Sequence, residues 1–129
     1  PRDDILAAKW FRIAAENGFA LAQLNLGVLY MGEALKKDYP EAFRWFSKAA
    51  EAGNAKAMTN LGLMHEKGWG VAQDDAAALA WYQKGAAAGD WGAMGNISQA
   101  YKDGTLGLKQ DPEKADEWYR KYLEAQLKR

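Results

Sequence analysis

Four tryptophans recur at nearly constant spacing along the chain. Trp10, Trp45, Trp81 and Trp118 lie 35, 36 and 37 residues apart, and a second aromatic residue directly follows each of them. A glycine stands eight residues after each of the first three, and an alanine stands four residues after each glycine. A period of this length without a strand pattern indicates a helical solenoid. Such proteins mostly work by presenting an extended surface to a partner.

Each repeating unit divides into two helices. In the middle unit, small and apolar residues at helical spacing predict a first helix over 54–66. The segment Gly68-Trp69-Gly70-Val71 then predicts a turn, because glycine tolerates positive φ. Asp74 or Asp75 is the expected N-cap of the second helix, and Gly89 is the expected residue after its end. The same division along the whole chain predicts seven helices.

An aspartate stands seven residues before every one of the four tryptophans. These predicted helix N-caps are Asp3, Asp38, Asp74 and Asp111. The separation between the last three caps and the aromatic residue closing the preceding helix grows from 8 to 9 to 10 residues. Length variation is therefore expected in the turns alone, where it leaves helix packing unchanged.

Small residues recur where two helices are expected to touch. Gly27 and Gly62 lie inside predicted first helices, although a glycine there costs about 1 kcal/mol relative to alanine. We interpret them as sites of close helix contact, with Ser98 standing in their place in the third unit. Tyr122-Leu123 replaces the alanine pair of the earlier units, which indicates that the last helix caps the stack.

The repeating pattern resembles the Sel1-like repeat, a relative of the tetratricopeptide repeat, and the resemblance covers essentially the whole chain. The first unit departs from it at Glu33-Ala34-Leu35, which lacks the glycine turn, and the third has Ile97-Ser98 in place of Leu-Gly. The second unit carries the pattern best, with Ala57, Leu61-Gly62, His65, Gly68-Trp69-Gly70-Val71, Asp74, Ala78, Trp81-Tyr82, Ala86 and Gly89.

The resemblance implies an all-α fold, a right-handed α/α superhelix whose first helices line the concave face. We expect one domain over 1–129, with a helix of a partial repeat at 1–18 and units at about 19–53, 54–89 and 90–129. The resemblance also implies an adaptor for protein assembly, often in bacterial envelopes, secretion or host interaction. We therefore favour an exported or periplasmic location in a bacterium, and leave a cytoplasmic one open.

The expected partner surface is the face of each first helix that points away from the predicted core. The same face also carries residues that we do not count among the candidates, namely Thr59, Glu66-Lys67, Gly92 and Gly95. The candidate partner-binding residues are Leu21, Leu24, Asn25, Val28 and Met31 in the first unit, Lys56, Asn60 and Leu63 in the second, and Asn96, Gln99 and Lys102 in the third.

Two features of this surface each have two interpretations. Asn25, Asn60 and Asn96 occupy the same position in successive units, and an amide both donates and accepts hydrogen bonds. They either grip the backbone of an extended peptide or tie one unit to the next. The apolar run from Leu21 to Met31 is either an exposed interface or packs against the N-terminal helix or a missing upstream unit.

Most catalytic and cofactor chemistry lacks the residues it needs. The chain has no cysteine, and its one histidine, His65, occupies a slot held by tyrosine in the other units, so we expect a packed, hydrogen-bonded role rather than a zinc site. Trp69 and Trp91 are either interface residues or half-buried packing. The 17 basic and 17 acidic residues balance, which argues against nucleic acid. No apolar run reaches the roughly 20 residues of a membrane span.

The sequence therefore predicts a non-catalytic module without cofactor or metal that binds a protein or peptide. One use of such a module is an adaptor or scaffold. The alternative is an immunity or inhibitor protein that sequesters a secreted toxic effector. Either a monomer or a homodimer is compatible with the pattern.

Overall fold

The computed structural model describes residues 2–32 and 35–128, apart from the side chains of Arg2 and Asp4. Pro1 and Arg129, at the two ends of the predicted domain, and Glu33-Ala34 of the predicted irregular turn lie outside the described residues. The described part contains the seven predicted helices and no strand. They are α1 (Arg2–Glu16), α2 (Ala20–Met31), α3 (Tyr39–Glu51), α4 (Ala55–Lys67), α5 (Asp75–Ala87), α6 (Trp91–Asp103) and α7 (Pro112–Leu127).

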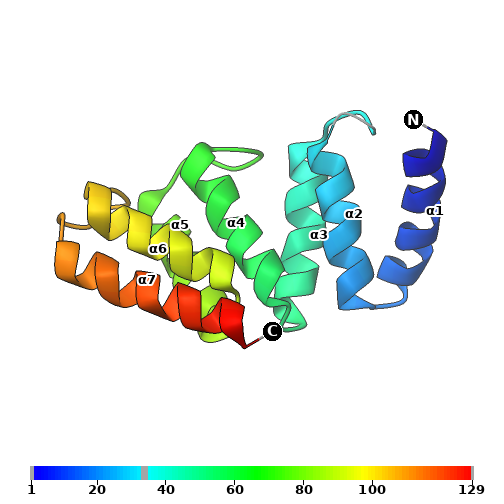
Figure 1. Ribbon diagram of the computed structural model, residues 1–129. Coiled ribbons are helices and arrows are strands. Elements are labelled where there is room, and N and C mark those ends of the chain that lie inside the picture. The colour runs from blue at the N-terminus through cyan, green and yellow to red at the C-terminus, as the bar shows by residue number, and fades with distance from the viewer. Residues whose placement is uncertain (1, 33–34, 129) are drawn as a thin grey trace.

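The helices pack in chain order as a solenoid (Figure 1). The pairs α2–α3, α4–α5 and α6–α7 each form one unit, and α1 packs against α2 without a partner of its own. Figure 1 shows α1 at one end of the molecule and the α6–α7 pair at the other. Helix α4 also approaches α6, so the first helices of the second and third units lie next to each other.

Aspartate caps begin the second helix of each complete unit. The side chains of Asp38, Asp74 and Asp111 each accept a 3.1 Å hydrogen bond from the backbone N–H three residues later. These caps are confirmed, and Asp74 rather than Asp75 is the cap of α5. The predicted cap at Asp3 is wrong, because α1 already begins at Arg2 and Asp3 lies inside its first turn.

The turn within each unit is closed by the same backbone hydrogen bond, whatever its length. In each case the N–H of the capping aspartate donates to the carbonyl of the aromatic residue near the end of the preceding helix. This agrees with the prediction that insertions stay within the turn. The three bonds are Asp38 to Tyr30 at 2.9 Å, Asp74 to His65 at 2.9 Å and Asp111 to Tyr101 at 2.8 Å.

The glycines inside the first helices lie directly under aromatic rings. A Cβ added to Gly27 would stand 2.6 Å from Cε1 of Phe46, and one added to Gly62 would stand 2.6 Å from Cδ1 of Tyr82. Carbon atoms do not approach so closely, so the steric reason predicted for these glycines is confirmed. The hydroxyl of Tyr82 donates a 2.7 Å hydrogen bond to Glu66.

The four tryptophans differ in how deeply they are buried. Trp45 is fully buried, because Ala15 of α1 and Ala22 and Leu26 of α2 pack around its ring. Trp81 and Trp118 are half-buried. Trp10 is exposed on α1. Trp45, Trp81 and Trp118 each pack against a core cluster, as predicted, and Trp45 is the most deeply buried of them.

Candidate functional site

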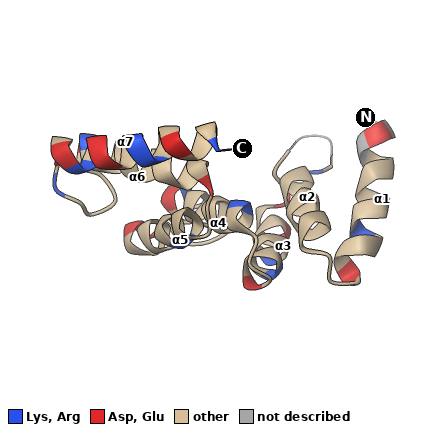
Figure 2. Cartoon of the chain, turned by 60° about the horizontal axis from the view of Figure 1, so that its bottom comes forward, with Lys and Arg blue, Asp and Glu red and all other residues tan. Residues whose placement is uncertain are grey.

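The outward face of α2, α4 and α6 holds most of the predicted partner-binding residues. Two of its apolar side chains are strongly exposed, Leu21 at 64% and Val28 at 50%. The polar members Lys56, Asn96, Gln99 and Lys102 are exposed as well, whereas Asn25, Met31, Asn60 and Leu63 are half-buried. Figure 2 shows that α2 carries no charged residue, while acidic and basic residues alternate along α7.

The prediction that Leu24 faces the outside is wrong. Its side chain is 8% exposed and belongs to the core cluster formed with α3 and α4, where its neighbours include Ala49 and Leu61. Met31 packs partly against the same cluster. The exposed apolar run therefore shrinks to Leu21 and Val28, and the rest packs toward the following unit rather than toward α1.

Thr59 occupies the position equivalent to Leu24 and is also buried, at 7% exposure. Its hydroxyl lies 2.6 Å from Oδ2 of Asp90, the N-cap of α6. The physical reason is shared by Leu24 and Thr59: in α2 and α4 this position points at the start of the next unit, where it cannot meet an external partner. Gly85 makes room for it, since a Cβ there would stand 2.6 Å from the Thr59 hydroxyl.

The three equivalent asparagines have no side-chain hydrogen bond within the part of the chain that the structure describes. Asn25 and Asn60 are half-buried, and Asn96 is exposed. None of the three side chains donates a hydrogen bond to another described group or accepts one from it. The contact that does tie two units together comes from Thr59 instead. The amides are thus left with unused donors and acceptors on the outward face.

Two adjacent hollows lie between α6 and α7, of about 410 Å³ and 430 Å³. Both are lined by Gln99, a predicted partner-binding residue, and by Tyr119. The first is also lined by Asn96 and the second by Lys102. The structure therefore brings the three predicted residues of the third unit together around one hollowed surface.

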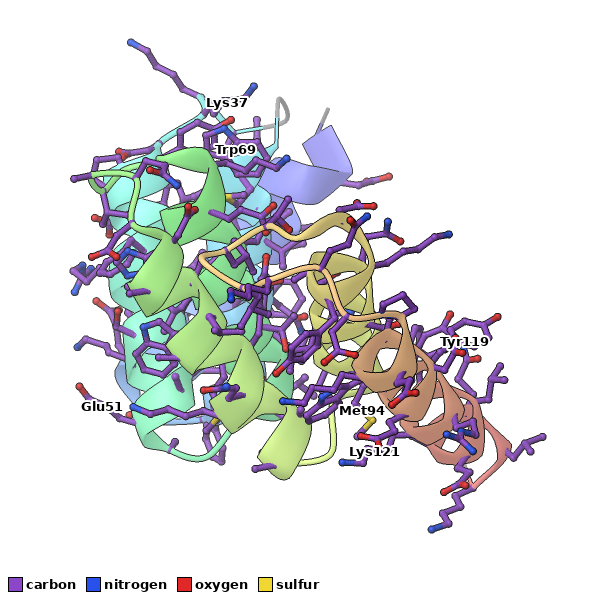
Figure 3. The ribbon with its side chains drawn as sticks, turned by 90° about the vertical axis from the view of Figure 1, so that its left-hand side faces the viewer. Lys37, Glu51, Trp69, Met94, Tyr119 and Lys121 are labelled. Atoms are coloured by element: carbon purple, nitrogen blue, oxygen red, sulfur yellow. The ribbon has the colours of Figure 1, made fainter. Side chains whose placement is uncertain are left out.

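Sequence reasoning missed the aromatic residues on this surface. Tyr119 is 51% exposed (Figure 3), and its ring stacks on Tyr122 with the ring centres 5.6 Å apart. The equivalent rings of Phe46 and Tyr82 are buried over a glycine, whereas the third unit has Ser98, whose hydroxyl donates a 2.7 Å hydrogen bond to the carbonyl of Ala115. The change from glycine to Ser98 was the signal that could have revealed an exposed Tyr119.

The two tryptophans outside the repeat pattern both pack against neighbouring rings. Trp69 stacks on Tyr39 with the ring centres 5.5 Å apart, and the structure places its turn at the same end of the molecule as Lys37 (Figure 3). Trp91 meets Tyr122 edge-on at 5.8 Å, and the ammonium of Lys56 lies 5.9 Å from its ring centre. Both side chains are half-buried and in contact with a neighbouring ring.

His65 is packed as predicted, but the hydrogen bond expected of its ring is not found among the described residues. Its ring meets Phe43 edge-on with the centres 5.7 Å apart. Its Nδ1 atom is buried, and no described group lies within hydrogen-bonding distance of that atom. Among the residues that the structure describes, no group of three or more His, Asp or Glu side chains could hold a metal ion.

The shifted pKa values have structural causes. Burial, together with the hydrogen bond to Glu66, raises the pKa of Tyr82. The guanidinium of Arg44, 2.8 Å away, lowers the pKa of the half-exposed Glu41 carboxyl. These two groups belong to different units and do not form a common acid–base site. Within the described residues, no helix is both long and apolar enough to cross a membrane.

Comparison with known families places the same repeat along the chain. The model of the family described as Sel1 repeat matches residues 1–19, 20–54, 55–90 and 92–124. No curated protein sequence matches the chain.

Solved structures resemble this one over nearly its full length. A Sel1 repeat protein from Oxalobacter formigenes is 35% identical, with a TM-score of 0.83 over 92% of this chain and 48% of that one. The antigen c5321, a protective antigen of uropathogenic Escherichia coli strains that displays an SLR fold, is 38% identical, with a TM-score of 0.82 over 90% of this chain and 25% of that one. This chain thus spans about half the length of the first protein and a quarter of the second.

A third structure, cysteine rich protein B of Helicobacter pylori, shares the fold at lower identity. It is 20% identical, with a TM-score of 0.72 over 95% of this chain and 88% of that one. All three structures come from bacterial proteins.

Proposed function

Because this chain belongs to the Sel1 repeat family, whose members generally serve as protein-interaction scaffolds, we propose that it is a non-catalytic adaptor that binds a protein or peptide on the outward face of α2, α4 and α6. The observation that carries the proposal is the row of Asn25, Asn60 and Asn96, whose amides have no described partner. These amide groups are open to solvent, so a bound peptide can replace their hydrogen bonds to water with hydrogen bonds to its own backbone.

The chemistry of this row suits an extended peptide. Each amide offers a donor and an acceptor, which is what a peptide group presents in return. Main-chain hydrogen bonds of this kind give affinity without demanding one sequence, and neighbouring side chains add specificity. Leu21 and Val28 at one end and Tyr119 at the other are exposed apolar groups that could supply it.

The test compares the wild-type protein with the Asn60→Ala variant. Each is immobilised and exposed to lysate of the native organism, the retained proteins are identified by mass spectrometry, and the affinity of the retained partner is then measured by calorimetry. Gln83→Ala is the matched control, because Gln83 is an exposed amide on α5, outside the proposed face. A substitution at Leu24, which was also predicted on this face, is not a suitable test of binding. Leu24→Glu would place a charge at a buried position and disturb the core.

The expected result is a partner that is retained by the wild type and the Gln83 variant and bound about tenfold more weakly by the Asn60 variant, as for loss of one or two interface hydrogen bonds. The melting temperature should stay nearly unchanged. A large loss of stability on Asn60→Ala would instead assign the asparagines a structural role. A single retained enzyme that loses its activity on binding would favour the inhibitor alternative over the adaptor.

A further inference from the structure

A groove of about 730 Å³ lies at the α1 end of the molecule, between α1, α2 and residues 35–38. We refer to it as the α1–α2 groove. Its walls are mainly apolar and include Ile5, Ile13 and Leu35. Ile5 and Ile13 are both about half exposed, so their side chains are open to a ligand. It is larger than each of the hollows between α6 and α7.

The corresponding place in the second unit is filled by the turn after α4. Trp69 stacks on Tyr39 at the start of α3. Gly70 lies so close to the same segment that an added Cβ would stand 2.8 Å from the carbonyl carbon of Tyr39. The turn therefore closes down on the second helix of the preceding unit.

The third unit is closed in a similar way by a different side chain. Leu106 is buried in the core cluster of Ala78 and Tyr82, although its φ of 56° is unusual for a leucine. Such a conformation is unfavourable for a residue with a Cβ, and burial of the leucine side chain offsets its cost. In the first unit, among the described residues 35–38 of the turn, Leu35 lines the groove beside Ile5 and Ile13 of α1.

The rim of the groove is basic. Lys9 and Arg12 project from α1, and Lys36 and Lys37 come from the turn. Arg12 donates a hydrogen bond to the hydroxyl of Tyr30 and so stays fixed beside the groove. Asp38, the one carboxylate among the described lining residues, accepts a hydrogen bond from the backbone N–H of Glu41 as the N-cap of α3.

This positive charge is local rather than general. The chain has 17 basic and 17 acidic residues and no net charge. Among the described residues that line this groove, four are basic and one is acidic. A concave, mainly apolar site with a cationic rim fits a ligand that combines an apolar group with carboxylates.

We propose that the α1–α2 groove binds an acidic peptide segment of a partner protein, with one large apolar side chain seated between Ile5 and Leu35 and carboxylates facing the basic rim. A groove of this volume accommodates a few side chains rather than a flat surface, and a chain without net charge provides no long-range attraction for nucleic acid or an anionic membrane. This site is separate from the outward face of α2, α4 and α6 and does not depend on it.

The experiment measures binding of a fluorescein-labelled peptide, in which aspartates and glutamates flank a phenylalanine, by fluorescence anisotropy. One comparison peptide carries lysines in place of the acids, and another carries serine in place of the phenylalanine. The test variant is Lys9→Glu with Lys36→Glu. The control is Lys109→Glu with Arg120→Glu, because Lys109 stands at the same distance before its capping aspartate as Lys36, and both control residues are exposed and distant from the groove.

The acidic peptide is expected to bind the wild type and the control variant equally and the test variant about tenfold more weakly, with weaker binding at higher salt. The lysine and serine peptides should bind much more weakly. Amide NMR shifts on peptide addition should concentrate on α1 and residues 35–38. Circular dichroism verifies that both variants remain folded.

Four results would overturn the proposal. The first is absence of binding by the acidic peptide, and the second is an equal loss in the test and control variants, which would mean attraction to overall charge. The third is unchanged binding of the serine peptide, which would remove the apolar contact. The fourth is stronger attachment to vesicles containing phosphatidylserine than to the peptide, with the same dependence on Lys9 and Lys36, which would make the groove a membrane contact.

Discussion

The hydroxyl of Thr59 lies 2.6 Å from Oδ2 of Asp90 and donates a hydrogen bond to it across the junction between the second and third units. The same carboxylate oxygen accepts the backbone N–H of Ala93 at 3.2 Å and so caps α6. One side chain thus begins a helix and receives a bond from the preceding unit. In a solenoid, where each unit contacts only its neighbours, such a junction bond contributes directly to stability.

Replacing this threonine by valine tests the junction. Thr59→Val keeps the shape of the side chain but leaves Asp90 without its second partner, so the free energy of unfolding should fall by about 1.5 kcal/mol, as for a hydrogen bond to a charged group. Urea unfolding monitored by circular dichroism measures this change in the free energy of unfolding. Thr105→Val is the control, since Thr105 is exposed in a turn. Equal stability of the two variants would contradict the role given to Thr59.

The glycine under Tyr82 should not tolerate a larger side chain. Gly62→Leu should lower the free energy of unfolding by about 3 kcal/mol, because the ring of Tyr82 and the carbonyl of Ala78 already occupy the space around it. Gly95→Leu is the control, because a Cβ at Gly95 meets only the ring of Tyr122 at an ordinary contact distance of 3.4 Å. A melting temperature unchanged by Gly62→Leu would mean that the helices do not depend on this close contact.

Two aspartates that are equivalent in sequence should differ in their effect on stability. Asp74→Ala removes the cap that binds the backbone N–H of Ala77 and should lower the free energy of unfolding by about 1 kcal/mol. Asp3→Ala should change it little, because Asp3 lies inside α1 and caps nothing. Chemical denaturation of both variants side by side measures the difference. A similar loss in both would show that the repeat pattern, rather than the observed helix start, decides the role of this aspartate.

Tyr82 should make the protein sensitive to alkaline pH. Its pKa is raised in the folded protein, so the unfolded chain ionises first, near the ordinary tyrosine pKa of about 10. Above that pH the unfolded state binds fewer protons than the folded state, and stability falls as the pH rises. Below it, both states hold the proton and this group contributes no pH dependence.

The Tyr82→Phe variant isolates this contribution. It cannot ionise at position 82, so its free energy of unfolding should decline less steeply than that of the wild type between about pH 9 and about pH 11. At neutral pH the variant should be less stable, because the hydrogen bond to Glu66 is lost. Parallel curves for the two proteins over the alkaline range would rule out Tyr82 as the titrating group.

The candidate partner surface could be predicted only in part. The outward positions of Leu21 and Val28 and of the third-unit polar residues follow from helical periodicity, because the side opposite a core stripe is exposed. Helical periodicity places Leu24 and Thr59 on the same outward side, but both side chains are buried. Whether such a residue is covered depends on how the next unit leans against its helix, and the residues of one helix contain no information about that angle.

The sequence by itself determined the helices, their order, the aspartate caps of three units and the glycines at close contacts. Each of these depends on residues within one unit, where hydrogen bonding and sterics act over a few positions. Tertiary structure alone decided which equivalent positions are buried and where Tyr119 and the α1–α2 groove lie. These properties depend on contacts between units, since equivalent side chains such as Leu24, Thr59 and Gly95 meet different neighbours in each case.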